Sequence, residues 1–190
     1  NSIESPDQIH NLVQSAAASG FNTLFVQVRG RGDAFYNSSL EPRAQELSKQ
    51  PLSFDPLQTV IDDAHARGMQ VQAWVNACYV WSSNTPPKSA QHIVNQHPDW
   101  MARNSDGKFS LSPNTGAGGA FVSPSNPSAR QELHDVCVEL TKNYDIDGLH
   151  LDYIRYADSD YDYSAQAVGS FASMMRGRIS VQDCARLDLK

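Results

Sequence analysis

Residues 147–156 read DGLHLDYIRY, and this stretch decides the fold. It is predicted to form a buried β-strand that ends in charged and aromatic residues. Side chains alternate between the two faces of a strand, so the two leucines share one face with Tyr153, while His150 and Asp152 share the other with Gly148. An unpaired buried charge costs several kcal/mol. The stretch therefore predicts that the carboxylate of Asp152 is either paired or used, and makes Asp152 the first candidate for catalysis.

Two further strands are predicted, and each of the three strands follows an amphipathic helix. The helices are predicted from capping residues and from apolar residues at helical spacing, and the strands from alternating apolar residues. The helices cover residues 6–20, 56–68 and 127–144, and the two further strands cover residues 22–29 and 69–76. Repeated helix–strand units predict parallel strands joined by helical crossovers.

The faces of these strands distinguish an open sheet from a barrel. In an open parallel sheet helices cover both faces, and the strands are apolar throughout. Here one face of each strand is apolar and the other mixes Gln, Trp, Asn, His and Asp, which favours a barrel with a polar catalytic mouth. The predicted fold class is therefore α/β, a partial (β/α)8 TIM barrel. A whole barrel has eight strands, so residues 1–190 are predicted to form a single partial barrel domain.

Composition excludes several classes of partner. The chain of 190 residues has a net charge of -6 and no block of Lys or Arg, so no nucleic acid partner is expected. No apolar run approaches the ~20 residues of a transmembrane segment. The cysteines, Cys78, Cys137 and Cys184, fit no zinc spacing, and the strand ends carry no second His or Glu cluster beside His150, so neither a metal nor a cofactor is expected. Nothing in the sequence predicts the oligomeric state.

The segment between residues 77 and 123 is predicted to be irregular, with a short helix near residues 90–96. A connection of this length indicates a function such as forming a binding wall. The glycine-rich residues 115–119 lack the helix start of a phosphate loop and are predicted to be a flexible linker. A weaker helix is predicted from residue 164 to residue 176.

In barrels of this kind the active site lies at the carboxyl ends of the strands. Here these ends supply aromatic, amide and carboxylate groups. Such groups suit a sugar, because its ring stacks on aromatic side chains and its hydroxyl groups need polar partners. Arg29 or Arg31 is expected to hold a negative group or to keep Asp152 ionised. Asp152 is the predicted catalytic residue, and the predicted substrate-binding residues are Gln27, Arg29, Arg31, Trp74, Asn76, His150, Arg155 and Tyr156.

Several of these residues also have a purely structural interpretation. Asp152 could form an ion pair with Arg29 or Arg155, and His150 could be a hydrogen-bonded core histidine. Trp74 could simply fill the barrel interior. Asn76 and Gln27 are expected to be functional, because buried amides demand partners.

Six segments together resemble a known family, the bacterial glycosyl hydrolase-like family ten, which is related to the amylase type of barrel hydrolases. The segments are FNTLFVQVRGRGDAFY (21–36), FDPLQTVIDDAHARG (54–68), VQAWVN (71–76), HPDWMAR (97–103), FVSPSNPSAR (121–130) and NYDIDGLHLDYIRY (143–156). The resemblance covers about residues 5 to 156. It rests on the whole run of spaced motifs, which is far more specific than any one of them.

The resemblance implies a (β/α)8 barrel that acts on glycosidic bonds or descends from enzymes that do. It also implies a secreted, periplasmic or cell-envelope protein, with a polysaccharide or peptidoglycan glycan strand as partner. In the family pattern a further strand precedes the first helix. The three strands of this chain would then be the second to fourth, and Asp152 would stand where amylase-type enzymes keep their nucleophile.

Glycoside hydrolysis normally needs two carboxyl groups, and the sequence identifies only one of them. The amylase-type partner is expected on the next strand, which the sequence does not show after Asp152. The second carboxylate is either absent or supplied by loop residues such as Asp33, Asp99 or Asp160. Two hypotheses follow: a glycoside hydrolase, and a non-catalytic glycan-binding module that keeps the groove without the chemistry.

Overall fold

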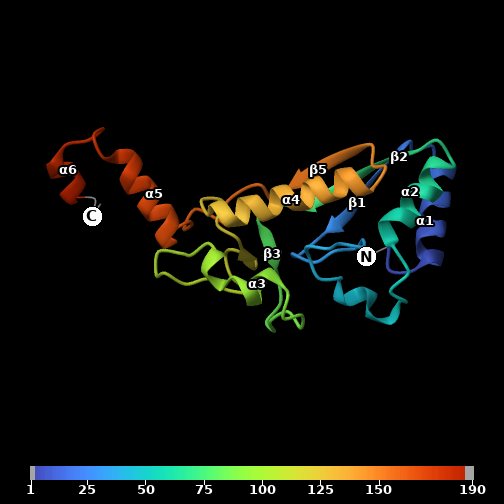
Figure 1. Cartoon of the computed structure of the whole chain (residues 1–190), viewed down its shortest axis with the longest axis horizontal. Helices are drawn as coiled ribbons and strands as arrows, with labels where there is room; N and C mark the ends of the chain where they lie inside the picture. The colour runs from blue at the N-terminus through green and yellow to red at the C-terminus, as the bar shows by residue number, and fades with distance from the viewer. Residues whose placement is uncertain (1–2, 187–190) are drawn as a thin grey trace.

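The computed structural model describes residues 3–186 (Figure 1). Its main sheet contains three parallel strands in the order β1 (Thr23–Arg29), β2 (Gln70–Asn76) and β5 (Gly148–Asp152). The predicted strands and their parallel arrangement are confirmed. Parallel strands with a helix before each one form part of a (β/α)8 barrel.

A capped helix precedes each strand of this sheet: α1 (Pro6–Ala18), α2 (Pro56–His65) and α4 (Pro127–Asn143). Each begins with proline after a polar cap, and the caps are Ser5, Asp55 and Asn126. The cap side chains accept hydrogen bonds from the first free backbone N–H groups, which explains why the helices begin at these residues.

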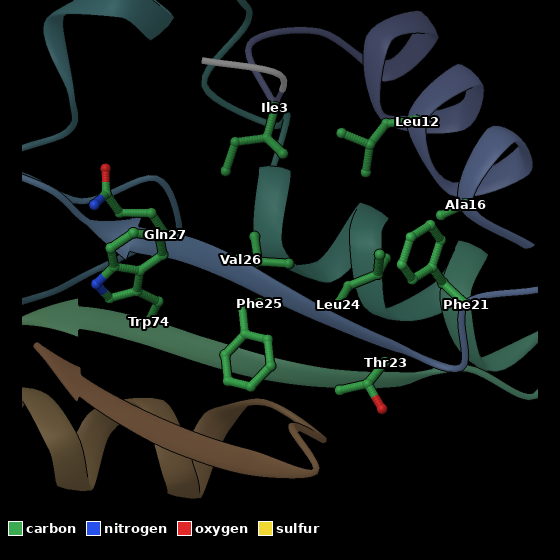
Figure 2. Close-up of a pocket in the computed structure, with 10 residues that line it drawn as sticks. All are labelled: Ile3, Leu12, Ala16, Phe21, Thr23, Leu24, Phe25, Val26, Gln27 and Trp74. Carbon is green, nitrogen blue, oxygen red and sulfur yellow. The ribbon is translucent and has the colours of Figure 1, made fainter. Parts of the chain in front are cut away.

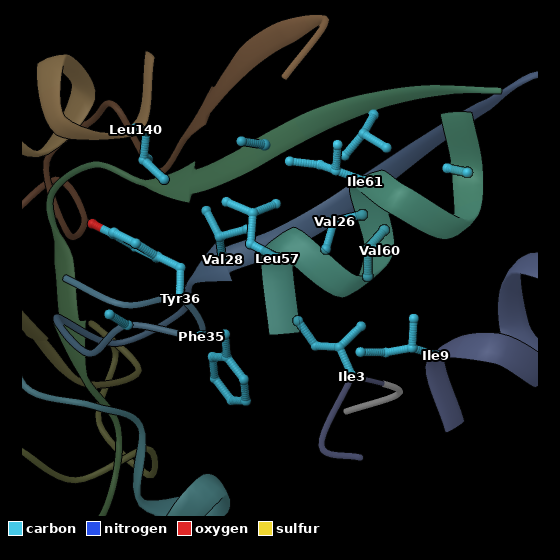
Figure 3. Packing of buried hydrophobic residues seen from close by; sticks show 14 of the residues in the cluster. Ile3, Ile9, Val26, Val28, Phe35, Tyr36, Leu57, Val60, Ile61 and Leu140 are labelled. Atoms are coloured by element: carbon cyan, nitrogen blue, oxygen red, sulfur yellow. The ribbon is translucent and has the colours of Figure 1, made fainter. Parts of the chain in front are cut away.

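The main hydrophobic core lies between this sheet and the helices. Val26 and Val28 of β1 pack with Leu57, Val60 and Ile61 of α2 (Figure 3). Ile9 of α1, Val71, Ala73 and Val75 of β2, and Val136 and Leu140 of α4 belong to the same cluster. On the opposite face of the sheet Phe25 is 59% exposed and His150 is also exposed. One covered and one open face are the arrangement expected of a barrel segment whose inner face looks away from its helices.

The long segment after β2 contains more structure than the sequence predicted. It forms the antiparallel pair β3 (Tyr79–Trp81) and β4 (Ala120–Phe121), with its own apolar cluster. The short helix is present as α3 (Ile93–Gln96). The 3-10 turn η2 (Pro98–Trp100) also lies in this segment and was not predicted. A second unpredicted 3-10 turn, η1 (Gln45–Lys49), lies earlier in the chain, between β1 and α2. At the other end of the chain, α5 (Ala165–Met175) and α6 (Val181–Arg186) extend away from the sheet (Figure 1).

Three predictions about local structure were wrong. The key strand β5 is not buried, because it lies at the edge of the sheet, and His150 and Leu151 are exposed. Tyr153 does not continue its apolar face, because its backbone leaves the strand with φ +50°. The glycine-rich residues are also more than a flexible linker. Gly119, at φ +144°, lies directly before β4, and a Cβ there would be 2.2 Å from the backbone oxygen of Trp81.

We expect Gly119→Ala to destabilise the protein by more than about 2 kcal/mol, because backbone of β3 would have to move and the φ value is unfavourable. Gly118→Ala is the matched control, since Gly118 also has a positive φ but has no other atom within 4 Å of the position that a Cβ would take. The control is expected to cost about 1 kcal/mol. Urea unfolding of the two variants measures the difference, and equal losses would contradict the close packing of β4 against β3.

Candidate functional site

The carboxyl ends of the three strands meet at one edge of the sheet. Strand pairing places Gln27 beside Trp74, Trp74 beside His150, and Asn76 beside Asp152. A cavity of about 530 Å³ opens at this edge, and we call it the mouth cavity. It is lined by Gln27, Gly30, Arg31, Asp33, Phe35, Glu46, Trp74, Asn76, Tyr79, Ser82, Asp152 and Tyr153. Five predicted site residues therefore share one cavity.

Asp152 is half-buried at the wall of the mouth cavity. Its Oδ1 accepts a hydrogen bond of 2.7 Å from the backbone N–H of Tyr153. The left-handed backbone of Tyr153 accompanies this contact, and such strain in a non-glycine residue is common at functional sites. Among residues 3–186, Asp152 forms no ion pair with Arg29 or Arg155. The carboxylate is thus held by a backbone N–H and not by either of these arginines.

Arg29 lies below the cavity and does not line it. Its side chain is 2% exposed, and its guanidinium contacts the equally buried Glu41 at 2.6 to 2.8 Å. It also donates to the backbone oxygens of Asn76 and Ala77. Burial acts to lower the pKa of Arg29, but the adjacent Glu41 carboxylate leaves that pKa raised. The guanidinium of Arg29 therefore connects the end of β1 to the end of β2, and it does not lie where a residue that binds substrate was expected.

Asn76 forms hydrogen bonds with two other residues that line the cavity, Trp74 and Gly30. Its Oδ1 accepts from the indole N–H of Trp74 at 3.0 Å, and its Nδ2 donates to the backbone oxygen of Gly30 at 2.8 Å. The amide is 4% exposed. The partners that a buried amide demands are therefore supplied by the protein, and they orient Trp74 toward the cavity.

Besides Arg29, three predicted residues lie outside the mouth cavity. His150 lies two residues before Asp152 on the open face of the sheet. The centre of its ring is 6.0 Å from that of Trp74 and 5.3 Å from that of Phe25, and both contacts are edge-on. Arg155 donates to the backbone oxygens of Tyr156 and Ala157 and lies 4.9 Å above the Tyr153 ring. Tyr156 is 45% exposed. His150 is therefore not a buried core histidine. Arg155 does not line the cavity, but it contacts Tyr153, which does.

Arg31 lines the cavity, but its charge is shared. Its Nη2 lies 2.5 Å from Glu46 and 3.9 Å from Asp33. Its guanidinium also stacks over Trp81 at 4.9 Å from the ring centre. Three carboxyl groups, from Asp33, Glu46 and Asp152, therefore face the cavity with one guanidinium, so the site does not have the positive excess that binding of an anion requires.

Asp33 is the most unusual group at the site. It is 3% exposed, its Oδ1 accepts from the backbone N–H of Arg31 at 3.1 Å, and its buried Oδ2 has no hydrogen-bond partner among the described residues. Burial raises the pKa of Asp33 to about 6, against the lowering effect of Arg31. A carboxyl group with such a pKa exchanges its proton near neutral pH.

The sequence had named Asp33, Asp99 and Asp160 as possible sources of a second carboxylate. The structure brings only Asp33 to the mouth cavity, since neither of the other two lines it. It adds Glu46, Tyr79, Ser82 and Tyr153, which sequence reasoning missed. All four residues lie in the segments that directly follow β1, β2 and β5. These segments start at the carboxyl edge of the sheet, and this position could have identified them from the sequence.

A second hollow, of about 520 Å³, follows the free edge of β1 (Figure 2). Its lining is mainly apolar and includes Leu12, Ala16, Leu24 and the largely exposed rings of Phe21 and Phe25. Figure 2 shows Gln27 and Trp74 together at one end of this hollow, and both residues also line the mouth cavity. Apolar walls along an unpaired strand suit packing against protein better than binding of a sugar.

Within residues 3–186 no group of three or more His, Cys, Asp or Glu side chains is arranged to hold a metal ion. None of the helices in this part of the chain combines the length and apolar content that crossing a membrane requires.

Comparison with known proteins identifies relatives over almost the whole chain. The model of the family described as glycosyl hydrolase-like 10 matches residues 2–177. Glycosyl hydrolase YngK of Bacillus subtilis is 28% identical over 172 residues, which cover 87% of this chain and 30% of that protein. Glycosyl hydrolase DigH of Escherichia coli is 30% identical over 175 residues, which cover 81% of this chain and 37% of that protein. The chain thus spans about a third of the length of these relatives.

Solved structures support the fold. The alpha-L-fucosidase isoenzyme 2 of Paenibacillus thiaminolyticus matches 92% of this chain and 23% of its own chain, with a TM-score of 0.64 and 18% sequence identity. At this identity the match concerns the fold alone. It agrees with the barrel segment described above, which is of the glycoside hydrolase type.

We expect Glu41→Gln to destabilise the protein by about 3–5 kcal/mol, because it leaves the buried guanidinium of Arg29 without its counter-charge. Glu46→Gln is the matched control. It removes a carboxylate from the same loop, but the Arg31–Glu46 pair is about 30% exposed, so a loss below about 1 kcal/mol is expected. Chemical denaturation of both variants measures the difference, and losses of similar size would show that Arg29 does not depend on Glu41.

We expect Asp33→Asn to stabilise the protein at pH 7 to 8. The folded carboxyl group, with its pKa raised from 3.8 to about 6, holds its proton more tightly than the unfolded one. Its favourable contribution is therefore complete below pH 3.8 and is lost as pH rises through about 6. Asparagine is neutral throughout and keeps an oxygen for the N–H of Arg31, so a gain on the order of 2–3 kcal/mol is expected. Thermal unfolding from pH 4 to pH 8 tests this, and a variant less stable than wild type at pH 8 would contradict it.

Proposed function

Because the chain belongs to the glycosyl hydrolase-like 10 family, we propose that it forms part of a glycoside hydrolase that cleaves a polysaccharide or the glycan strand of peptidoglycan. The observation that carries the proposal is the carboxylate of Asp152, which lies at the wall of the mouth cavity and is held there by the backbone N–H of Tyr153. In this proposal Asp152 is the nucleophile or stabilises the positive charge that develops on the sugar in the transition state. Active sites at this edge of a barrel sheet support the assignment.

The other groups of the mouth cavity suit the recognition of a sugar. Trp74 offers an aromatic wall oriented by Asn76, and the amide of Gln27 lies beside it. Aromatic faces stack on sugar rings, and amides bind hydroxyl pairs. Arg31 and Glu46 would contact the sugar at the rim. His150 and Arg155 with Tyr156 would act from outside the cavity, on a longer stretch of glycan.

We further propose that the remaining strands of the barrel are supplied by other parts of a longer protein. YngK and DigH are about three times longer than the segment matched here. The unpaired edge of β1 and the apolar hollow beside it suit one more strand. The substrate is a large extracellular polymer in this proposal, so the site is expected to be secreted, periplasmic or in the cell envelope.

We expect Asp152→Asn in the intact protein to lower the release of reducing sugar from cell-wall glycan or polysaccharide by about 10³-fold or more. Asparagine keeps the Oδ1 that accepts from Tyr153, so thermal unfolding should change little. Asp145→Asn is the control, because its side chain is 94% exposed near the opposite end of β5. Unchanged turnover in Asp152→Asn would rule out the catalytic role. Glycan binding without turnover by the wild type would instead support the non-catalytic binding module.

A further inference from the structure

Another cavity lies between the long segment after β2 and the loop after β5, and the proposed function does not use it. We call it the distal cavity, and its volume is about 350 Å³. Its lining includes Phe109, Gly116, Ala117, Asp158, Asp160 and Tyr161. Both segments start at the carboxyl edge of the sheet. The lining of the distal cavity therefore comes from the side of the barrel that carries active sites.

Hydrogen bonds hold the two walls of the distal cavity together. The backbone N–H of Tyr163 donates to the backbone oxygen of Arg103 at 2.7 Å, and the backbone N–H of Arg103 donates to Oδ1 of Asp162 at 3.1 Å. The walls also approach each other closely at Gly116, where a Cβ would lie 3.1 Å from Oδ2 of Asp158. Gly116 therefore leaves space beside Asp158 that a larger side chain would fill.

The lining combines half-buried rings with exposed polar groups. Phe109 and Tyr161 pack against the apolar cluster that contains β3 and β4, and both remain partly exposed. Asp158, Asp160 and Lys108 line the same cavity and are exposed. Sugar rings stack on aromatic faces, and carboxylate and ammonium groups form hydrogen bonds with hydroxyl groups. The lining therefore has the chemistry of a sugar-binding site.

Other ligands fit the distal cavity less well. Two carboxylates and one ammonium group give no positive excess, which an anion would require. The two carboxylates also do not form a metal site, because no group of three suitable side chains is present in the described part of the chain.

One contact connects the distal cavity to the mouth cavity. Tyr79 lines the mouth cavity, and its hydroxyl group donates to the backbone oxygen of Gly118 at 3.3 Å. Gly118 follows Ala117, which lines the distal cavity. Tyr153 of the mouth cavity and Tyr161 of the distal cavity pack against the same apolar cluster. A glycan chain that extends from the mouth cavity over this cluster would therefore reach the distal cavity.

We propose that the distal cavity binds a remote sugar unit of the polymer that is cleaved at Asp152, an inference that rests on the proposed function. The occupant is a further unit of the same glycan chain. Its binding adds affinity in the ground state and in the transition state alike, so it lowers KM and leaves kcat unchanged. The distal cavity thus makes the site selective for long glycans over short ones.

The test compares long and short substrates. Wild type, Phe109→Ala and Gly116→Leu in the intact protein are assayed on peptidoglycan glycan strands, on amylose, and on nitrophenyl glycosides of glucose and N-acetylglucosamine in both anomers. Phe109→Ala removes a ring, and Gly116→Leu fills the space beside Asp158. Asp106→Ala is the control, because Asp106 is exposed in the turn before Lys108 and does not line the cavity.

We expect both cavity variants to raise KM for the polymer by about 3- to 10-fold, the value of one aromatic contact, with kcat unchanged. Cleavage of the nitrophenyl glycosides should stay at the wild-type rate, and Asp106→Ala should match wild type on every substrate. An unchanged KM for the polymer in the folded variants, or equal losses on the nitrophenyl glycosides, would overturn the inference and leave the role of Asp152 intact. Thermal unfolding identifies a variant that has lost its fold, and the other variant then decides.

Binding gives a readout that does not need turnover. Sedimentation of the same proteins with peptidoglycan sacculi and with insoluble starch measures it. A wild type that binds a glycan without cleaving it would remove the proposed hydrolase. Weaker binding by Phe109→Ala and Gly116→Leu, but not by Asp106→Ala, would then still support the distal cavity as a glycan site. A wild type that neither binds nor cleaves these glycans would overturn the proposed function and the inference together.

Discussion

The buried contact between Arg29 and Glu41 is the interaction on which the site depends. Arg29 stands at the carboxyl end of β1, Glu41 comes from the loop that follows, and the guanidinium also binds two carbonyl oxygens at the end of β2. One side chain thus fixes two strand ends and a loop relative to each other. Breaking such a pair costs more than forming it gains, because the remaining charge is left buried. The interaction serves to specify geometry.

The loop held in this way forms one wall of the mouth cavity, and a second contact attaches this loop to α3. The Nε2 of His92, the cap of α3, donates to the backbone oxygen of Arg31 at 2.8 Å. Gly32 has φ +71°, and a Cβ there would be 3.2 to 3.3 Å from Ile93 and His92. Burial lowers the pKa of His92 to about 4, which keeps the ring neutral with one nitrogen donating and the other accepting from Val94. The loop after β1 is therefore held from two sides, by Arg29 and by His92, and is preorganised beside the strand ends.

The sequence predicts the features of the fold and the site that depend on neighbouring residues, and it does not predict those that depend on contacts between distant residues. Capping residues and alternation act within a few residues, so the helices, the parallel strands and the barrel class were predicted. The exposure of β5 was not, because it depends on what covers the strand edge. Arg29 was expected at the substrate, since nothing near it in sequence announces Glu41, 12 residues away in an irregular loop. Asn76 shows the same limit in part, because one partner of its amide, Gly30, lies 46 residues away in the sequence, although the other, Trp74, is on the same face of the same strand.

Asp33 and Glu41 lie in the same loop after β1, and both carboxyl groups are buried, but their partners differ. Glu41 accepts hydrogen bonds from Arg29 with both oxygens, whereas the Oδ2 of Asp33 has no hydrogen-bond partner among the described residues, only the guanidinium of Arg31 at 3.9 Å, and burial raises the pKa of Asp33. A loop selected only for stability would be expected to pair both carboxyl groups fully or to carry a neutral side chain in place of Asp33. An unrelieved cost at the wall of a cavity is typical of groups retained for chemistry. The contrast with Glu41 in the same loop therefore weighs against a purely structural role for Asp33.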